Sequence, residues 1–216
     1  MDINTKTLKK NAFRVTKERG KTAARVRIPG GYLDAKYLNI LQNIAQTYGN
    51  GTLHITIRQG FEIPGIPMKY IPEVNKALQP IIEGLEINQE STNNGYSASG
   101  TRNVSACIGN NVCPFANYIN RKFAKKIEKA IFPNDYHVKI ALTGCANDCI
   151  KARMQDFGII GMTEPQYDSY RCIGCKACVN TCMKKSTGAF SFENYKVVRD
   201  HSKCIGCGEC INKCPT

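Results

Sequence analysis

Every cysteine in this 216-residue chain belongs to a closely spaced group, and there are 12 of them. Eight of them form two runs with the same spacing, C-x2-C-x2-C-x3-C, and both runs begin with Cys-Ile-Gly-Cys. The first run extends from Cys172 to Cys182, and the second extends from Cys204 to Cys214 and is followed by Pro215. This spacing with a final Cys-Pro is typical of bacterial ferredoxins, in which thiolates hold [4Fe–4S] clusters. The repeat therefore predicts a small domain folded around two such clusters.

In ferredoxins with this pattern, the fourth cysteine of each run binds the cluster that is held mainly by the other run. We therefore expect two sets of four ligands, each drawing three cysteines from one run and one from the other. The first set comprises Cys172, Cys175, Cys178 and Cys214. The second set comprises Cys204, Cys207, Cys210 and Cys182.

The other four cysteines form two close pairs in the middle of the chain. Cys107 and Cys113 have C-x5-C spacing, and Cys145 and Cys149 have C-x3-C spacing. Four thiolates from two loops suit either one iron–sulfur cube or one zinc ion. The C-x5-C pair is wide for zinc, whose paired ligands are usually about two to four residues apart, and four buried structural cysteines are a further alternative. Because no cysteine is left over, the simplest interpretation is three [4Fe–4S] clusters and no disulfide.

The composition predicts a buried core and no membrane span. Hydrophobic residues make up 42% of the chain, and no apolar run approaches the roughly 18 residues that a membrane helix needs. Residues 1–6 lack the apolar centre of a secretory signal peptide. Iron–sulfur thiolates also require reducing surroundings. We therefore expect a cytoplasmic protein that works under anaerobic or oxygen-poor conditions.

The formal net charge of +13 invites a nucleic-acid interpretation. A [4Fe–4S] cluster with four thiolates carries about −2, so three clusters reduce the surplus to about +7. That surplus could serve nucleic acid, an acidic protein or an anionic cofactor, while most lysines, such as Lys125, Lys126 and Lys129, fit a solvated helix face. Nucleic-acid binding would need basic residues interleaved with exposed aromatic residues, and the sequence has no such stripe.

The first segment with clear periodicity begins at residue 23, after a polar and basic stretch that we expect to be a surface arm. Residues 23–28 alternate between small or apolar residues and arginines, which predicts a strand with Arg25 and Arg27 on one face. Two guanidinium groups on one strand face are costly unless solvent or an anion meets them. The sequence therefore requires one of these two on that face.

The following stretches predict a helix and another strand, which complete a β-α-β unit over residues 23–58. The helix is expected over residues 33–48, which carry apolar residues at helical spacing, namely Leu38, Leu41, Ala45 and Tyr48. Residues 52–58 alternate between apolar and polar types. They predict a strand with one face formed by Leu53, Ile55 and Ile57.

Further helices and strands are expected up to Thr163, where the composition becomes polar and rich in cysteine. Residues 88–100 have the composition of a loop, and Asp148 is suited to cap a short helix. The remaining helices are expected at residues 72–84 and 114–131, and the remaining strands at residues 138–143 and 157–161. The apolar positions of the 114–131 helix are Phe115, Ile119, Phe123, Ile127 and Ile131.

Five motifs give the chain its resemblance to the siroheme-dependent nitrite and sulfite reductases, over residues 23–161. Three of them are Ala-Arg-Val-Arg-Ile-Pro-Gly-Gly at 24–31, Thr-Ile-Arg-Gln at 56–59 and Thr-Arg-Asn-Val at 101–104. The C-x5-C and C-x3-C pairs follow in the family's order. The appended double-cluster ferredoxin is most similar to that of the anaerobic, dissimilatory-type sulfite reductases.

The resemblance implies an α+β fold in three domains. A ferredoxin-like β-α-β half domain with its N-terminal arm would occupy residues 1–66. An α/β domain for siroheme and one [4Fe–4S] cluster would occupy residues 67–163. A bacterial-type 2[4Fe–4S] ferredoxin domain would occupy residues 164–216.

The resemblance also implies siroheme beside the first cluster, with Cys149 bridging the cluster to the siroheme iron. The carboxylates of siroheme carry about 8 negative charges, which would bring the surplus of about +7 close to zero. The chain departs from the family in two respects, since it has one siroheme-binding half and ends at Thr216, where relatives continue. We therefore expect either a truncated sequence or a pocket completed by another copy or subunit, in a homo- or hetero-oligomer.

The family pattern assigns substrate binding to Arg27 and Arg102, because arginine is always charged and donates several hydrogen bonds. A Lys-x-Lys pair normally completes this set, and the matching stretch here is His-Val-Lys at 137–139. Lys139 therefore fits the pattern and His137 departs from it. A histidine with a pKa of roughly 6.5 could also donate protons near neutral pH. Weaker candidates, for the siroheme carboxylates, are Arg25, Arg58 and His54.

These assignments lead to three functional hypotheses. The first is reduction of sulfite to sulfide, with electrons supplied by ferredoxin-like and flavin- or nicotinamide-using donor subunits and relayed through the two ferredoxin clusters. The second is reduction of nitrite at the same site. The third is a polyferredoxin that only transfers electrons, although such a protein has no need for arginines placed to bind an anion.

Overall fold

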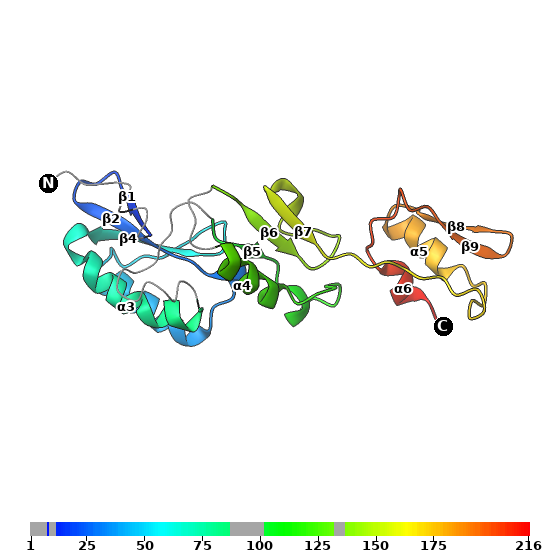
Figure 1. The fold of residues 1–216 in the computed structure, drawn as a ribbon, viewed down its shortest axis with the longest axis horizontal. Coiled ribbons are helices and arrows are strands. Elements are labelled where there is room, and N and C mark those ends of the chain that lie inside the picture. Colours follow the sequence, from blue (N-terminus) through cyan, green and yellow to red (C-terminus); the bar gives the residue numbers. More distant parts are fainter. Residues whose placement is uncertain (1–7, 9–11, 87–101, 132–136) are drawn as a thin grey trace.

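The computed structural model describes residues 8, 12–86, 102–131 and 137–216. Three parts follow one another along the long axis of the molecule (Figure 1). A four-stranded sheet with helices α2 and α3 comes first, a three-stranded sheet with helix α4 comes next, and a small cysteine-rich module comes last. An extended segment after strand β7 (Phe157–Ile160) leads into this module. The predicted loop at 88–100 lies outside the described residues.

The first sheet is antiparallel, and its strand order is β1-β2-β4-β3. Its strands are β1 (Phe13–Val15), β2 (Lys21–Val26), β3 (His54–Ile55) and β4 (Phe61–Pro67). Strand β2 confirms most of the strand expected at 23–28. The expected surface arm is wrong for β1, because Phe13 is buried there and pairs with Ala24.

Helices α2 (Leu38–Thr47) and α3 (Ile71–Gly84) lie together along this sheet (Figure 1). Both were expected, although α2 begins later than predicted and Leu38 is exposed. Pro80 is accommodated inside α3. Their buried side chains join the sheet in one core, to which the helices contribute Leu41, Ile44, Ala45, Val74, Leu78, Ile81 and Ile82. This core therefore extends past residue 66, and the three-domain division stays a prediction.

The strand predicted at 52–58 is wrong for most of its length, because the chain reverses direction there. The Thr56 N–H donates to the Gly60 carbonyl at 2.8 Å, and the Thr56 Oγ1 accepts from the Gly60 N–H at 3.0 Å. Only His54–Ile55 pairs with β4. The apolar residues expected to face inward are exposed instead, and Ile57 is 100% exposed. A Cβ at position 60 would come within 2.6 Å of the Val26 carbonyl oxygen, so glycine is required at this turn.

The second sheet is parallel and has the order β5-β6-β7. Strands β5 (Ser105–Ala106) and β6 (Ile140–Thr143) lie beside β7, and α4 (Asn120–Ile131) packs against them. The strands predicted at 138–143 and 157–161 are confirmed in their central parts. The helix predicted at 114–131 begins six residues late, so Phe115 and Ile119 precede it and are exposed, as is Phe123 within it. The buried stripe of α4 is instead Asn120, Ala124 and Glu128.

The cysteine-rich module consists of α5 (Ala177–Lys185), a hairpin of β8 (Phe190–Glu193) with β9 (Lys196–Arg199), and α6 (Glu209–Lys213). Its buried residues are Val179, Cys182, Ala189, Phe190 and Cys210. Short 3-10 turns elsewhere in the chain cover Pro29–Gly31, Ala35–Tyr37, Met68–Tyr70, Gly109–Asn111 and Ala152–Met154. Within the described part of the chain, no helix has the length and apolar character needed to cross a membrane.

Candidate functional site

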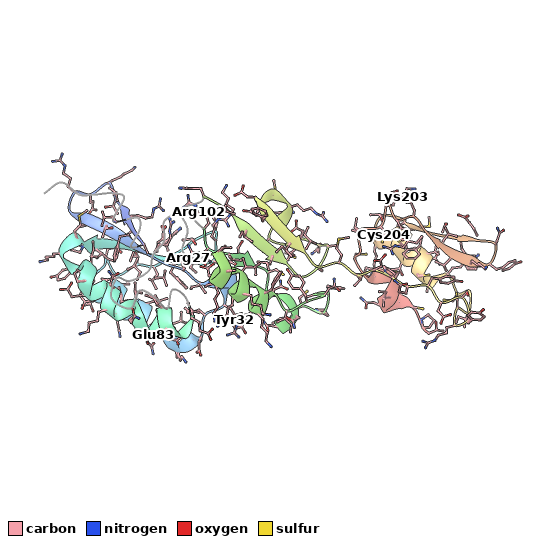
Figure 2. All side chains as sticks on the ribbon, in the orientation of Figure 1. Arg27, Tyr32, Glu83, Arg102, Lys203 and Cys204 are labelled. Atoms are coloured by element: carbon pink, nitrogen blue, oxygen red, sulfur yellow. The ribbon has the colours of Figure 1, made fainter. Side chains whose placement is uncertain are left out.

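A cavity of about 340 Å³ opens where the first sheet meets the second part of the chain. Figure 2 labels Arg27 and Arg102 at this junction. Glu62 is the one carboxylate among the described residues that line the cavity. Six cationic side chains line it, namely Arg14, Arg25, Arg27, Arg58, Arg102 and Lys139. Such an excess of cations suits a ligand with several negative charges.

Arg25 and Glu62 are opposite each other on strands β2 and β4. The Glu62 Oε1 accepts hydrogen bonds from the Arg25 Nε at 2.9 Å and the Arg25 Nη2 at 2.6 Å, and from the Arg14 Nη1 at 2.9 Å. Burial opposes ionisation of Glu62, but the hydrogen bonds from Arg25 and Arg14 outweigh burial and lower its pKa. Part of the positive charge on this side of the cavity is therefore neutralised within the protein.

Arg27 is held by Glu128, which no sequence pattern had singled out. The Glu128 Oε1 accepts from the Arg27 Nη2 at 2.5 Å and from the Arg27 Nε at 2.8 Å, and both side chains are 2% exposed. Burial raises the pKa of Glu128, and the positive charge of Arg27 opposes that rise. The pair joins the residue after β2 to α4, so it fixes one cation of the cavity and also connects two parts of the fold.

Arg58 has a polar group that no protein atom satisfies. Its Nη2 donates to the Gln155 Oε1 at 2.5 Å, whereas its Nη1 is buried and has no hydrogen-bond partner among the described residues. Burial lowers the pKa of Arg58, and the charge of Arg102 lowers it further. A buried donor without an acceptor costs about 1–3 kcal/mol, so an anion in the cavity would stabilise this arrangement.

Two amide side chains fix the turn that carries Arg58, and neither was expected as a site residue. The Asn103 Nδ2 donates to the carbonyls of Arg58 at 2.6 Å and Ile28 at 2.8 Å. The Gln59 Nε2 donates to the Ala106 carbonyl at 2.7 Å, and its Oε1 accepts from the Ala106 N–H at 2.8 Å. Both residues belong to motifs quoted above, and this was the signal that could have identified them.

The cavity gathers some of the expected site residues and leaves one outside. Arg25, Arg27, Arg58, Arg102, Lys139 and His54 all line it. The backbone of Lys139 is held by Asp156, whose Oδ2 accepts from the Lys139 N–H at 2.8 Å. His137 is exposed and is not among the described residues that line the cavity. Its role as a proton donor therefore stays a prediction.

The first four thiols lie together at the ends of β5 and β6. Burial raises the pKa of Cys145 most, and the neighbouring sulfurs of Cys113, Cys149 and Cys107 raise it further. The Cys107 Sγ accepts a hydrogen bond from the Gly144 N–H at 3.1 Å, an interaction that favours a thiolate. The predicted cap is confirmed, because the Asp148 carboxylate accepts from the N–H groups of Ala152 at 2.6 Å and Arg153 at 3.1 Å.

This donor set suits an iron–sulfur cube better than a single ion. Among the described residues, no three histidine, cysteine or carboxylate side chains converge closely enough to bind one metal ion. The four ligands of a cube are spread over its iron corners and do not need to meet at one point. The chemistry of four clustered thiols therefore fits a [4Fe–4S] cluster, and the ligand assignment stays a proposal.

The eight thiols of the module form two groups, divided as the spacing predicts. An open cavity of about 210 Å³ is lined by Cys172, Cys175, Cys178 and Cys214. A narrow pocket of about 10 Å³ is lined by Cys182, Cys204, Cys207 and Cys210. A cluster in the narrow pocket would hold its sulfurs farther apart. Each group combines three cysteines of one run with the fourth of the other, and cluster ligation by these thiols stays a proposal.

Family models match three consecutive stretches of the chain. A nitrite/sulfite reductase ferredoxin-like half domain matches residues 14–81, and a nitrite and sulphite reductase 4Fe-4S domain matches residues 97–205. A 4Fe-4S binding domain matches residues 197–216. The second of these matches covers half of the chain.

Curated proteins of known name are similar to the chain over most of its length. One component of the anaerobic sulfite reductase of Salmonella typhimurium is 44% identical over 198 residues, which are 89% of this chain and 59% of that protein. The coenzyme F420-dependent sulfite reductase of Methanocaldococcus jannaschii is 29% identical over 174 residues, which are 78% of this chain and 26% of that protein. The chain therefore spans less than two thirds of the length of these relatives.

Two solved structures share the fold. Dissimilatory sulfite reductase I superposes with a TM-score of 0.63 at 20% identity, covering 90% of this chain and 50% of that one. The Mycobacterium tuberculosis NirA protein superposes with a TM-score of 0.59 at 16% identity, covering 77% of this chain and 33% of that one. Together with the family models, these likenesses confirm the expected α+β fold with an appended ferredoxin module.

Proposed function

Because the chain belongs to the nitrite and sulfite reductase family, we propose that it reduces sulfite to sulfide at a siroheme. The observation that carries this proposal is the cavity lined by six cations, with its unpartnered Arg58 Nη1. The chemistry of siroheme suits these residues, because its many carboxylates need cationic partners. Sulfite is itself a small oxyanion, so both ligands call for the same kind of lining.

Siroheme, when bound, would supply an iron at which sulfite is reduced. We assign Arg58 and Arg25 to its carboxylates, with His54 as a further neighbour in the cavity lining. The unpartnered N–H of Arg58 is the strongest of these assignments. Arg25 is the weaker one, because Glu62 already accepts two of its hydrogen bonds.

Arg27 and Arg102 are assigned to the substrate, where their charge would bind the oxyanion. Each S–O bond that breaks releases its oxygen as water, which consumes protons, and guanidinium is a poor acid. Lys139 is the ammonium group in the cavity lining and can donate a proton. His137, two residues earlier and exposed, is assigned to the supply of protons from solvent.

The twelve thiols are assigned to three [4Fe–4S] clusters that deliver the electrons. Cys107, Cys113, Cys145 and Cys149 would hold the cluster beside siroheme. Cys149 is the exposed member of this group, which suits the bridging role that the family pattern gives it. The two thiol groups of the module would relay electrons from donor subunits. This chemistry requires a reducing, oxygen-poor compartment, for which we propose the cytoplasm.

Nitrite is the alternative substrate, since it is also a small anion that could bind at one iron. A polyferredoxin without catalysis is the alternative function. The cavity argues against it, because electron transfer alone does not need six cations around a space of this size. The relatives named above belong to sulfite reductases, which favours sulfite over nitrite.

The proposal is tested by purifying the full chain without oxygen from cells that make siroheme. We expect about 13 irons per chain, twelve in clusters and one in the macrocycle, with the visible absorption of a tetrapyrrole. We also expect sulfite to oxidise reduced methyl viologen in its presence, more efficiently than nitrite does. Iron near 8 per chain without a macrocycle would leave only an electron-transfer protein. A higher kcat/KM for nitrite would reverse the choice of substrate.

A further inference from the structure

The two thiol groups of the module are unequal in burial although their motifs are identical in spacing. In the group lining the open cavity, Cys175 and Cys214 are exposed. In the other group, Cys182 and Cys210 are buried. Because the spacing is the same in both runs, the difference arises from what surrounds each group. We call the open group the distal site (Cys172, Cys175, Cys178, Cys214) and the buried group the proximal site (Cys182, Cys204, Cys207, Cys210).

The proximal site faces the rest of the protein. The Gly206 carbonyl accepts from the Thr163 N–H and from the Thr163 Oγ1, both at 3.0 Å, and Thr163 lies on the segment that leaves the second sheet. The backbone approaches so closely that a Cβ at position 206 would come within 2.9 Å of the Met162 Cβ. Figure 2 labels Cys204 at the end of the module nearest the second sheet, and Figure 1 shows the loop before α5 at the opposite end.

The proximal site also has a cation beside it. The side chain of Arg199 is 17% exposed, and its Nε is buried without a hydrogen-bond partner among the described residues. The Cys204 N–H donates to the Asp200 carbonyl at 3.1 Å, which returns Cys204 to the residue next to Arg199. Hydrogen bonding to the Cys204 sulfur raises the pKa of Arg199. At the distal site, the corresponding neighbour of Cys172 is the neutral phenol of Tyr167.

These differences have a direct electrochemical consequence. Reduction adds one negative charge to a cluster, and a nearby cation stabilises that charge, so it raises the reduction potential. A buried cation does this more strongly than an exposed one, because solvent screens it less. An exposed cluster, in turn, is the one that an external donor can approach closely.

We propose that electrons enter the module at the distal site and leave it from the proximal site, and that Arg199 makes this direction downhill. A flavin or iron–sulfur donor loses one electron as the distal cluster goes from the 2+ to the 1+ state. The same electron then returns the distal cluster to 2+ and takes the proximal cluster to 1+. No bond is broken and no proton is transferred in either step. The inference rests on the cluster assignments of the proposed function and deepens them.

The test is a stepwise reduction of the cluster-loaded full chain with titanium(III) citrate, in the absence of sulfite, followed by electron paramagnetic resonance. We expect Arg199→Gln to lower the reduced-to-oxidised ratio of one module cluster about tenfold at a fixed potential, equivalent to about 59 mV for one electron. The other module cluster should not change. Arg199→Lys should recover most of the ratio, because it keeps the charge.

Lys203→Gln is the matched control, because Lys203 precedes Cys204 directly but its side chain is 64% exposed and pairs with Asp200 at 3.4 Å. We expect it to change the ratio less than twofold. Equal shifts in the two variants, equal shifts at both clusters, or no shift with Arg199→Gln would each overturn the role of Arg199. These readings do not depend on sulfite turnover, so the inference can fail while the proposed function holds.

The order of the two sites has its own test. Cys175→Ser should alter the resonance of the distal cluster and so identify its signal. When the parent chain is mixed rapidly with reduced methyl viologen, we expect that signal to appear before the proximal one. Simultaneous appearance, or the proximal signal first, would overturn the proposed direction.

Discussion

The first sheet and the cysteine-rich module build their cores from different materials. The first sheet buries aliphatic and aromatic side chains from β1, β2, β4, α2 and α3, and no cysteine belongs to that core. In the module, Cys182 and Cys210 are themselves core residues, beside only Val179, Ala189 and Phe190. One region can therefore collapse by burying apolar surface alone, whereas the other buries the groups that are meant to hold metal.

The comparison teaches where the stability of each region comes from. A segment of about 50 residues buries too little apolar surface to be stable by that alone, and small domains of this kind usually depend on metals or disulfides. All 12 cysteines are free thiols in the structure, so disulfides do not contribute. The first region should tolerate the loss of iron, and the module should not.

The strongest way to break this comparison is to remove the iron. Chelation under mild oxidation should unfold the module completely, because its folding energy is metal-binding energy. The first sheet should keep its structure. Amide hydrogen exchange measured before and after chelation would check this, with loss of protection expected over residues 164–216 and retention over β2, β4, α2 and α3. A module that stayed protected without iron would remove the contrast between the two regions.

The second prediction separates the cluster next to the cavity from the clusters of the module. Cys149→Ser should reduce sulfite turnover below detection, because the proposed bridge to siroheme is lost. The two module clusters should survive, since their thiols come from other loops. Electron paramagnetic resonance and a sulfite assay on the same sample would show both effects. Cys207→Ser is the counterpart, and it should slow turnover with the physiological donor far more than with reduced methyl viologen.

A third prediction concerns the buried pair that ties the first sheet to α4. Glu128→Ala should lower the free energy of unfolding by about 3–5 kcal/mol, because it leaves the charge of Arg27 buried without its partner. Glu128→Gln should cost less than about 1 kcal/mol, because burial already penalises the carboxylate charge and the amide keeps its shape. Denaturant unfolding would measure both. Equal losses would mean that the negative charge itself holds Arg27.

The pH dependence of stability follows from the same pair and is a smaller effect. Burial raises the pKa of Glu128, so the folded protein retains a proton that the unfolded chain has already lost. Stability should therefore fall as the pH rises from 4.5, the usual pKa of glutamate, to the higher pKa of the folded state. Glu128→Gln should abolish this part of the slope. A parent and variant with the same slope over that range would contradict the assignment.

The smallest expected effect distinguishes Lys139 from His137. Because Lys139 lines the cavity and His137 does not, Lys139→Ala should lower kcat/KM by about 10²-fold and His137→Ala by less. Activity of the parent should fall as the pH rises past the pKa of the donating histidine, and His137→Lys should move that limb upward. An unchanged rate and pH profile in His137→Ala would leave proton supply to Lys139.

Cysteine spacing predicted more of this molecule than hydrophobic periodicity did. The division of the eight module thiols could be predicted because cluster ligands are close together in the chain and their spacing is dictated by the cube. The alternation of Leu53, Ile55 and Ile57 imitated a half-buried strand, but the hydrogen bonds of Thr56 with Gly60 turn the chain there. Strand β4 was missed because Pro64 and Gly65 have the composition of a loop.

The cavity shows the same limit on sequence reasoning. Arg27, Arg102 and Lys139 could be found because they occupy motifs, and the structure brings them to one cavity. Glu128 could not be found, because its partner is 101 residues away and only the folded chain shows their pairing. The alternation in α4 pointed to the exposed Phe123, since a buried acid among lysines looks like a solvated helix face.

The side chain of Gln59 gives the site a mechanical property. Its amide forms a pair of hydrogen bonds with Ala106, as an additional strand would, and Ala106 directly precedes Cys107. On its other side, Gln59 adjoins Arg58, whose buried Nη1 is the donor left for an anion. The anchor of the anion and the anchor of the cluster are therefore one rigid lever. Thermal motion should displace both together, so the gap that an electron must tunnel across stays constant while the surrounding loops move.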